Sequence, residues 1–550
     1  MSSDVDAIVI GSGAGGLAAA VALARAGKKV QVFEQHYLPG GWCHSFPLEG
    51  FQFSPGVHYI GALDEHGFLR QVYEGLGVSE DLVFLELNPD GYDHVQIGQE
   101  KFDIPRGREL YAERLKQRFP SEAAGIDRYL EDMHGLAKEL MGGLRMRGLR
   151  DVPKFATSRT VRFGHRPLAR YLDGITKDPL LRAILTIQAG DHGMPPSTCP
   201  TAMHAAIVAH YFKGGYYPRG GARSLPKAFL KQLRRHGGNI KLRTAVERIL
   251  VEDGTAVGVR LADGTEVRAD VVISNADPGI TFGELVGPEH TPAKVAKRLQ
   301  KTTWSISGIS LFFAVDMDVR AAGLDSGNVW YSKTPNIEAF YDLVKRKDLS
   351  GLTSLPGAFL TTTTLKDPSK RRDDLHTMEA FCFVGMEPFA KWKDSTHEDR
   401  PADYEAEKAR LTDLMFDTLH DITPGLRDHT VFHALGTPLT NRFYVNSTEG
   451  NLYGTDKRLR QIGPFAWKTR TAIPGLHMVG ASTTGHGVAG ATMSGLFAAK
   501  DILGCRLDEL LDAKGPSLQT YPCEDPTSWP QELQPQRGPR PGMTEAAPVG

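Results

Sequence analysis

Cysteine is scarce in this chain and never paired. Five cysteines are scattered over 550 residues, and no two of them form a CxxC motif. The scatter excludes the common zinc sites and a redox-active dithiol. We therefore predict no metal site, and we expect reduced thiols in a cytoplasmic protein.

A surplus of one charge is also missing. The chain carries 64 Lys and Arg against 65 Asp and Glu, which leaves a formal net charge of −1. Proteins that bind nucleic acid concentrate positive charge, so we expect no nucleic-acid partner. The length of 550 residues exceeds the roughly 250–300 residues that one hydrophobic core usually serves, and this predicts several domains.

Uninterrupted apolar runs of the membrane-spanning kind are absent as well. Residues 7–24 and the run that begins at His477 are long and carry no Asp, Glu, Lys or Arg. Glycines inside both runs indicate a turn followed by a helix. Asp4 and Asp6 precede the first run, whereas a secretory signal begins with basic residues. We predict no transmembrane helix.

The chain does contain a nucleotide-binding pattern near its start. The apolar residues 7–10 predict a buried parallel strand, and a GxGxxG motif follows them. A helix-forming run then ends at Gly27, and a second apolar strand ends at Glu34. Because strand, glycines, helix, strand and acid occur in this order, we predict a dinucleotide site.

The glycines and the acid have separate tasks in such a site. Gly11 permits the tight turn, Gly13 lets the backbone approach the pyrophosphate, and Gly16 allows close packing of strand and helix. The helix N-terminus offers free N–H groups to the phosphates. Glu34 can accept hydrogen bonds from ribose hydroxyls and would repel a 2′-phosphate, which favours FAD or NAD over NADP. The cofactor contacts expected here are Gly11, Gly13, Ala14, Gly15, Gly16 and Glu34.

The next stretch, HYLPGGWCHSFPLEGFQFSPGVHYIG (36–61), helps to distinguish FAD from NAD. Gly40 and Gly41 can bring backbone against a second part of the same cofactor, which suits the longer FAD. A Gly-rich hairpin with ordinary aromatic packing is the alternative. In the first interpretation the residues that line the flavin ring are Trp42, Cys43, His44 and Phe46. A second stretch of chain would approach the same ring through Gly56, His58, Tyr59 and Gly61.

Two later segments support FAD. Residues 238–277 contain two alternating strands, the first beginning at Val246, and then a buried strand at 271–273. The segment from Leu476 predicts a strand, a Gly-rich loop and a helix. The N-terminal amides of that helix, near Ala491 and Thr492, are expected to stabilise negative charge on a reduced flavin.

Three segments also carry a resemblance to a known family. They read GGWCHSFPLEGFQFSPGVHYIG (40–61), GMPPSTCPTAMHAAIVAHYFKGGYYPRGGARSL (193–225) and PLTNRFYVNSTEGNLYGTD (438–456). They resemble the FAD-dependent phytoene desaturase, carotenoid isomerase and all-trans-retinol 13,14-reductase (retinol saturase) family, within the wider amine-oxidase-like flavoproteins. The resemblance covers most of residues 5–505, and the retinol saturase branch is the most similar.

The resemblance implies an α/β fold with a Rossmann-like FAD-binding domain of the amine-oxidase and phytoene-desaturase type. That domain would be discontinuous and would combine residues 1–65, 215–290 and 465–510. A mixed α+β, membrane-facing substrate domain would combine residues 66–214 and 291–464. Residues 515–550 are rich in proline and are expected to form a flexible tail.

One position departs from the family pattern. Many relatives carry an acid after the glycine of the late strand, where the acid contacts the ribityl chain of FAD. Here Gly480 is followed by Ala481 and Ser482. We expect Ser482 to replace the acid. The cofactor contacts expected outside the first motif are therefore Gly40, Gly41, Val246, Gly480, Ser482, Ala491 and Thr492.

The resemblance implies an FAD-dependent oxidoreductase that acts on C=C bonds of a long hydrophobic polyene or unsaturated lipid, by saturation, isomerisation or desaturation. No second nucleotide fingerprint is present, so electrons must come from or go to an external donor or acceptor. For proton transfer we favour His58, then Tyr59 and His44. The substrate is expected to meet an aromatic, His-bearing segment, where core packing is an equal alternative: His204, His210, Tyr211, Tyr216 and Tyr217.

Residues 140–172 interleave Arg and Lys with apolar side chains, which predicts peripheral membrane contact. A solvated basic surface is the alternative. Two other functions stay open on the same scaffold. One is a flavin oxidase for amines or amino acids, and the other is a non-redox escort protein that binds prenyl lipids.

Overall fold

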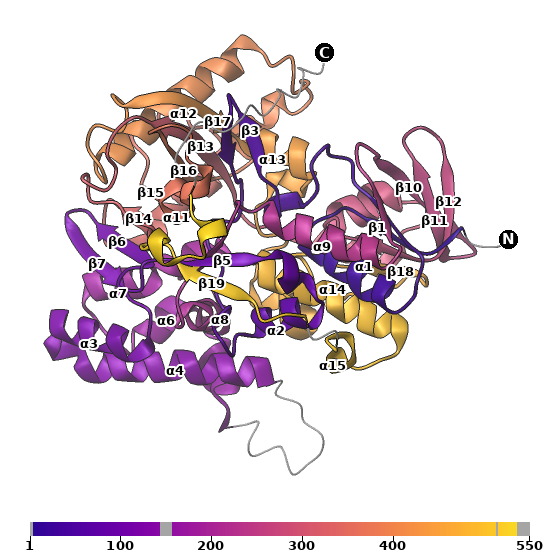
Figure 1. The fold of residues 1–550 in the computed structure, drawn as a ribbon, viewed down its shortest axis with the longest axis horizontal. Coiled ribbons are helices and arrows are strands. Elements are labelled where there is room, and N and C mark those ends of the chain that lie inside the picture. Colours follow the sequence, from indigo (N-terminus) through magenta and orange to yellow (C-terminus); the bar gives the residue numbers. More distant parts are fainter. Residues whose placement is uncertain (1–3, 143–156, 513–514, 536–550) are drawn as a thin grey trace.

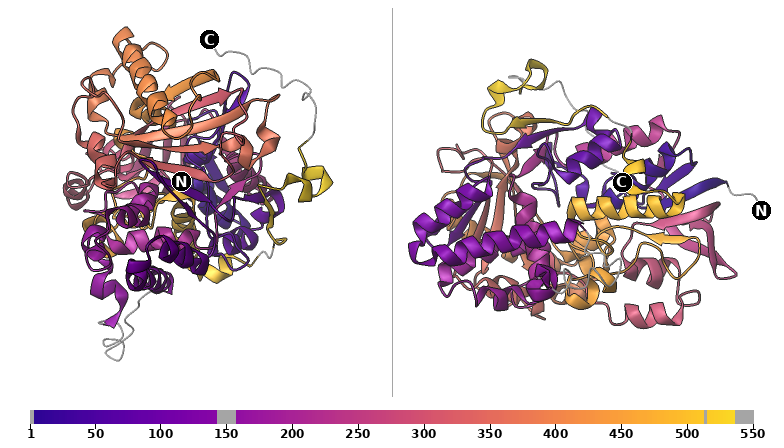
Figure 2. Two further views of the ribbon diagram at one scale, coloured as in Figure 1. Left: turned by 90° about the vertical axis from the view of Figure 1, so that its left-hand side faces the viewer. Right: turned by 90° about the horizontal axis from the view of Figure 1, so that it is seen from below.

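Two large sheets, built from interleaved parts of the chain, organise the molecule. A computed structural model describes residues 4–142, 157–512 and 515–535. In Figure 1 the sheet that contains β1 lies on the right and the sheet that contains β13 lies on the upper left. In the view from below, the start of the described chain, drawn in indigo, lies at the opposite end of the molecule from helices α3 (Arg108–Arg118) and α4 (Ala123–Gly142) (Figure 2).

The first sheet has a parallel core flanked by an antiparallel arm. Its order is β10-β11-β12-β1-β2-β9, and β18 also pairs with β12. The pairs β12·β1, β1·β2, β2·β9 and β12·β18 are parallel. The strands are β1 (Val5–Ile10), β2 (Val30–Phe33), β9 (Asn239–Lys241), β10 (Val246–Glu252), β11 (Thr255–Leu261), β12 (Glu266–Ser274) and β18 (Leu476–Met478).

Small residues let two helices approach each other closely against this sheet. Helix α1 (Ala14–Arg25) packs on α14 (Gly487–Leu503), and α9 (Ser224–Arg235) packs beside α1. A Cβ on Gly495 would lie 2.1 Å from the Gly15 carbonyl oxygen. No larger side chain fits there, so the alanine- and glycine-rich sequences of both helices are required by the crossing.

The elements expected in this half are present. The strand at 7–10, the helix that ends before Gly27, the strand that ends at Phe33 and the strands of residues 238–277 are all confirmed. One detail is wrong. Helix α14 begins at Gly487, so the amides of Ala491 and Thr492 lie beyond its first turn, and the free N-terminal amides belong to residues 487–490.

The second sheet is antiparallel except at one pair. Its order is β17-β13-β16-β15-β14-β6-β7, and only β14·β6 is parallel. The strands are β6 (Asp93–Ile97), β7 (Glu100–Ile104), β13 (Ser307–Val315), β14 (Asn328–Ser332), β15 (Gly357–Thr362), β16 (His376–Val384) and β17 (Thr430–Gly436). All of them fall inside residues 66–214 and 291–464, and all strands of the first sheet fall inside the other predicted pieces.

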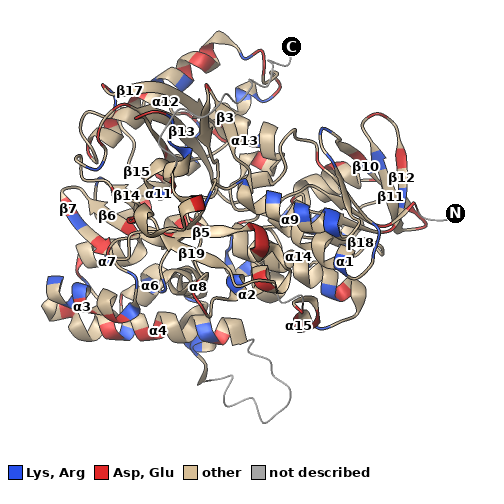
Figure 3. Ribbon diagram, viewed as in Figure 1, with Lys and Arg blue, Asp and Glu red and all other residues tan. Residues whose placement is uncertain are grey.

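Helices cover the second half and its lower edge. Helices α3 (Arg108–Arg118), α4 (Ala123–Gly142) and α8 (Thr201–Tyr211) form a layer below the sheet in Figure 1, and α12 (Ala402–His420) lies above it. Figure 3 shows both signs of charge interspersed along α3 and α4. Among the described residues, none of the helices combines the length and the apolar character needed to cross a bilayer. In the described part, the remaining α-helices of at least seven residues are α2 (Phe68–Gly75), α7 (Pro179–Thr186), α10 (Ala293–Leu299) and α13 (Pro438–Val445).

The expectation of a flexible tail is wrong for residues 515–535. Strand β19 (Gln519–Pro522) pairs in parallel with β5 (Val83–Glu86), which also pairs with β8 (Tyr216–Pro218). Cys523 and Trp529 are buried, and the Trp529 indole donates to the Pro522 carbonyl oxygen. Isolated apolar residues between prolines show no periodicity, but they dock on a strand edge supplied by another part of the chain. Residues 536–550 lie outside the described part.

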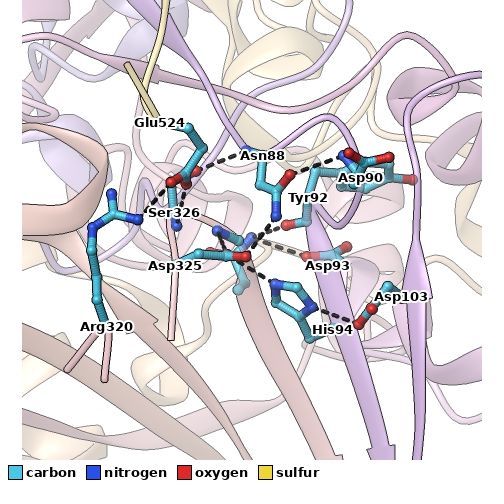
Figure 4. A network of polar contacts seen from close by, with 12 residues as sticks. Asn88, Asp90, Tyr92, Asp93, His94, Asp103, Arg320, Asp325, Ser326 and Glu524 are labelled. Atoms are coloured by element: carbon cyan, nitrogen blue, oxygen red, sulfur yellow. Dashed lines mark hydrogen bonds and ion pairs between the residues drawn. The ribbon is translucent and has the colours of Figure 1, made fainter. Parts of the chain in front are cut away.

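A partly exposed ionic cluster fixes the tail to the second sheet (Figure 4). The Glu524 carboxylate accepts from the Ser326 amide and pairs with Arg320. Next to it, Asp325 lies 2.9 Å from His94 Nε2, and Asp103 lies 2.7 Å from His94 Nδ1. Burial tends to lower the pKa of His94, but the two carboxylates outweigh it and raise that pKa to about 10.

This cluster predicts a pH-dependent stability. The His94 pKa is about 10 in the folded protein against 6.5 when unperturbed, so its contribution is complete below pH 6.5 and is lost as pH rises through 10. The free energy of unfolding should therefore fall by up to about 1.4 kcal/mol per pH unit above neutrality. Urea unfolding at several alkaline pH values measures it. His94→Gln should show a smaller slope, and identical slopes in both proteins would contradict the assignment.

Candidate functional site

A single large cavity joins the pieces of chain that the sequence singled out. It encloses about 1250 Å³, more than the roughly 300–1,000 Å³ of a pocket for one drug-sized ligand. Its walls include the first glycine loop, the loop at Gly40 and Gly41, the end of β12 and the loop from Gly480 to Ala491. Segments more than 400 residues apart in sequence therefore face one space.

Close backbone contacts hold these pieces together. A Cβ on Gly15 would lie 2.9 Å from each of three atoms, namely Asn275 Oδ1, the Gly480 nitrogen and the Ala491 carbonyl oxygen. A Cβ on Gly16 would lie 2.3 Å from the Gly11 carbonyl oxygen. The predicted close approach of strand and helix is thus observed, and it extends to the other two pieces as well.

Glu34 lies on the cavity wall at the end of β2 and organises the two loops beside it. Its Oε2 accepts from the Ser12 amide (2.8 Å) and hydroxyl (2.6 Å), and its Oε1 accepts from the His36 amide. The Ser12 hydroxyl in turn accepts from the Gly40 amide. Glu34 therefore orders the first glycine loop and the Gly40 loop around one space. A bound ribose would share this carboxylate with Ser12.

The late loop contributes backbone rather than an acid. The Gly480 amide donates to the Ser494 hydroxyl, and its φ of +98° requires glycine. Ser482 lines the cavity, and its hydroxyl accepts from the Thr455 amide, which leaves its proton and one lone pair for a ligand. Ala491 lines the cavity as well, whereas Thr492 is buried behind it.

These residues fit a bound FAD. Glycines at 11, 13, 40 and 41 leave room where side chains would stand, and a Cβ on Gly41 would already lie 3.3 Å from the Gly13 Cα. Helix α1 begins after Gly13 without a side-chain cap, and α14 begins after His486 without one. Two uncapped helix ends facing one cavity suit the negative charges of a dinucleotide. Val246 lies on the same wall.

The histidines favoured for proton transfer reach the cavity but are restrained. His44 donates from Nδ1 to the Gly41 carbonyl oxygen (2.6 Å), and burial lowers its pKa to about 4. His58 Nδ1 lies 3.1 Å from Glu379 Oε2, in an ion-pair contact rather than an aligned hydrogen bond. Phe359 and Phe381 pack on the His58 ring. Their catalytic roles stay predictions.

Only part of the expected substrate segment faces the cavity. His210 and Tyr211 line it, and His210 Nε2 accepts from the Gly61 amide. His204 does not line it, because its Nε2 lies 2.9 Å from the Tyr129 hydroxyl and the Leu185 carbonyl oxygen in the core.

Tyr216 and Tyr217 are also outside the cavity lining. They belong to β8, which pairs with β5, so their side chains serve that small sheet. The Tyr217 hydroxyl accepts from Lys370, and the Tyr216 hydroxyl donates to the Lys213 carbonyl oxygen. The substrate predictions for His204, Tyr216 and Tyr217 therefore have no support in the geometry.

The structure adds residues that the sequence did not single out. Asn275, just after the end of β12, accepts from the Gly16 amide and lines the cavity. His486 directly precedes α14, and neither of its ring nitrogens has a hydrogen-bond partner among the described residues. Asp191 lines the same space beside Tyr59. Of these residues, His486 alone had a visible signal in the sequence, namely its position between two glycines.

One part of the cavity wall is apolar, and we call it the apolar arm. Its residues come from α4 and α8, two helices that pack against each other. Four apolar lining residues are also exposed, and we call them the mouth of the arm: Leu140 and Met141 on α4, and Leu459 and Phe465 from another part of the chain. Its walls can bury hydrocarbon and expel water. The arm is lined by Ala137, Leu140, Met141, Ala202, Met203, Ala206 and Ile207.

Comparison with known proteins agrees with this site. The chain matches the family described as flavin containing amine oxidoreductase over residues 14–503. It is 32% identical to an all-trans-retinol 13,14-reductase of Danio rerio over 92% of this chain and 87% of that protein. It is 28% identical to prolycopene isomerase 1, chloroplastic, of an Oncidium hybrid cultivar over 94% and 86% of the two chains. A structure of putrescine oxidase bound to putrescine has the same fold, with a TM-score of 0.61, 17% identity and coverage of 91% and 99%.

The meeting point at Gly15 can be tested. In Gly15→Ala the new methyl would lie 2.9 Å from atoms of three chain segments, so those segments must shift apart. We expect loss of bound FAD, measured by absorbance, and a loss of about 1–3 kcal/mol of stability. Gly283→Ala is the control, since its Cβ would lie 3.9 Å from the nearest atom. Full FAD content in Gly15→Ala would contradict the close packing.

The cavity, its glycine walls and its uncapped helix ends agree with the matched family in cofactor and in architecture. The resemblance, the α/β FAD-binding fold and the FAD cofactor expected from the sequence are thereby confirmed. The chain belongs to the flavin containing amine oxidoreductase family and is an FAD-dependent oxidoreductase.

Proposed function

We propose that this protein reduces a carbon–carbon double bond in a long, hydrophobic polyene of the retinoid type, using electrons that an external donor supplies to FAD. The observation that carries the proposal is the apolar arm, whose α4 and α8 residues line the same cavity as the glycine loops that suit FAD. The likeness to all-trans-retinol 13,14-reductases favours reduction over isomerisation, because those relatives are more similar than the prolycopene isomerases.

The protein's own residues bind and orient the reactants. Bound reduced FAD would supply a hydride. Gly13, Gly41 and Glu34 would hold the dinucleotide. Asn275 would hold the N-terminal end of α1 in place through its hydrogen bond from the Gly16 amide. The arm would bind the polyene by burying hydrocarbon, at about 0.8 kcal/mol for each CH2 group. Its closed, water-poor walls would also place the double bond away from solvent.

An anaerobic experiment tests the reaction. The dithionite-reduced protein is mixed with all-trans-retinol, a set of carotenoids and unsaturated fatty acids. We expect flavin reoxidation together with a product two hydrogen atoms heavier than the substrate, because a saturase adds a hydride and a proton. A product of unchanged mass with a shifted absorption spectrum would show an isomerase instead. No reoxidation with any polyene would overturn the proposal.

The two other functions of the scaffold give different outcomes. An amine or amino-acid oxidase would release hydrogen peroxide with an amine panel in air. A non-redox escort protein would bind prenyl lipids without any need for flavin. The apolar residues of the arm favour a hydrocarbon over an ammonium or a carboxylate group in that part of the cavity, whereas charged residues such as Asp191 and Lys457 line other parts of it.

The substrate chemistry also suggests where the protein works. We propose that the mouth of the arm rests on a membrane surface, from which a polyene can enter without crossing water. Met141 is 70% exposed and Phe465 is 63% exposed, and both lie on the cavity wall. The basic charge predicted for residues 140–172 supports this less, because Arg159 pairs with Glu131 and Asp132, and residues 143–156 lie outside the described part.

Membrane contact at the mouth can be tested with one double variant and one matched control. Met141→Ser combined with Phe465→Ser should reduce co-sedimentation with anionic liposomes by about ten-fold or more, since each buried apolar side chain contributes about 1.5–3 kcal/mol. Val431→Ser should bind as the wild type does, because Val431 is 51% exposed on β17 and lies outside the cavity lining. Equal binding by all three proteins would refute the contact.

A further inference from the structure

The hydroxyl of Tyr59 lies between two carboxyl groups, those of the buried Asp93 and of Asp191, which is partly exposed. Its oxygen is 2.7 Å from Asp191 Oδ2 and 3.0 Å from Asp93 Oδ2. Tyr59 stacks on Tyr211, at 4.4 Å between ring centroids, which holds the phenol in place. Both oxygen–oxygen distances are those of hydrogen bonds.

Counting protons shows that one of these carboxyl groups must be protonated. A tyrosine hydroxyl carries one proton and can donate it to only one acceptor. If both aspartates were ionised, one short contact would bring two oxygens together with no hydrogen between them. A second proton, on one carboxyl group, lets that group donate to the Tyr59 oxygen while Tyr59 donates to the other group.

The surroundings decide which carboxyl group holds the proton. Asp93 accepts from the Gln188 amide group at 2.8 Å and from the Asn328 amide group at 3.0 Å, and Asn328 in turn accepts from the Lys366 ammonium. These donors stabilise the Asp93 carboxylate. Asp191 has no such donor, and Tyr59 is its one side-chain partner among the described residues. Burial, and then the Asp93 charge, raise the pKa of Asp191 well above its usual range.

Asp191 also stands where a reactant would be. It lines the cavity and is partly exposed to it, whereas Asp93 is fully buried behind Tyr59 on the inner face of β6. Its neighbours on the cavity wall include Tyr453 and His486, whose rings are 5.4 Å apart at the start of α14. The carboxyl group that holds the proton therefore borders the cavity near one of the two helix ends that suit FAD, while its proton is held in the hydrogen bond to Tyr59.

Resting on the function proposed above, we propose that Asp191 is the catalytic acid that protonates the double bond, and that Tyr59 and Asp93 are positioning residues that keep its proton in place. One carbon of the bond receives the hydride that reduced FAD supplies, and its neighbour receives the Asp191 proton. The π bond breaks, two C–H bonds form, FAD returns to its oxidised form, and Asp191 is left as a carboxylate. Water that enters as the product leaves restores the proton.

Infrared spectroscopy tests the protonation without any turnover. Spectra of the FAD-loaded protein at neutral pH, with no substrate, are recorded in the region of the carboxylic acid C=O stretch, with and without 13C-labelled aspartate. We expect one aspartic acid band that is absent in Asp191→Asn and shifted in Tyr59→Phe. Asp421→Asn is the matched control, because Asp421 also accepts from a tyrosine but is exposed, so the band should remain.

Turnover then tests the catalytic role. Asp191→Asn should keep its FAD and its thermal stability but reduce polyene reduction by about 100-fold or more, the usual effect of losing a general acid. A wild type without the band, or an Asp191→Asn variant that keeps the band or the full rate, would overturn the assignment. If no polyene is reduced by the wild type, the proposed function fails, while the infrared result still decides whether Asp191 holds a proton.

Discussion

The close approach of separate chain segments at Gly15 is the constraint on which the rest of the structure depends. A single missing side chain lets the start of α1, the end of β12 and the Gly480 loop meet within contact distance. Hydrogen bonds from the Gly16 amide to Asn275 and from the Gly480 amide to Ser494 then fix the three segments relative to one another. The cavity has its shape because those segments cannot separate, and the cofactor region and the apolar arm are parts of one space for the same reason.

The two halves of the molecule contribute different kinds of groups to the wall of that cavity. The first sheet offers backbone amides, helix ends and one carboxylate, Glu34, all suited to a polar dinucleotide. The second half offers apolar side chains from α4 and α8, together with a buried polar network behind Tyr59. Asp93 illustrates the division within a single strand. It faces inward to Tyr59, while the next residue, His94, faces the ionic cluster that holds the tail (Figure 4).

Local sequence patterns predicted the cofactor half well, because the tasks there are performed by backbone. A tight turn, a short parallel strand and a close helix crossing each demand glycine or small apolar residues at fixed spacing, so the sequence displays them. The substrate half was harder. Helix α8 presents His204 to the core and His210 to the cavity, although the two residues are only six positions apart. The helical period shows which residues share a face, but it does not show whether that face meets the core or the cavity. The ordered tail was missed because its strand partner, β5, lies more than 400 residues earlier.

Asp191 could not be found from its own surroundings in sequence, and the reason is general. An aspartate is ordinarily a surface residue or a helix cap, and only its environment makes it an acid that keeps its proton. Here that environment comes from Tyr59, in the stretch after the Gly40 loop, and from Asp93, on a strand of the other sheet. The sequence favoured His58, then Tyr59 and His44, for proton transfer, because histidine and tyrosine commonly transfer protons. Under the proposal made above, Tyr59 instead holds a proton on its neighbour Asp191 at the cavity wall.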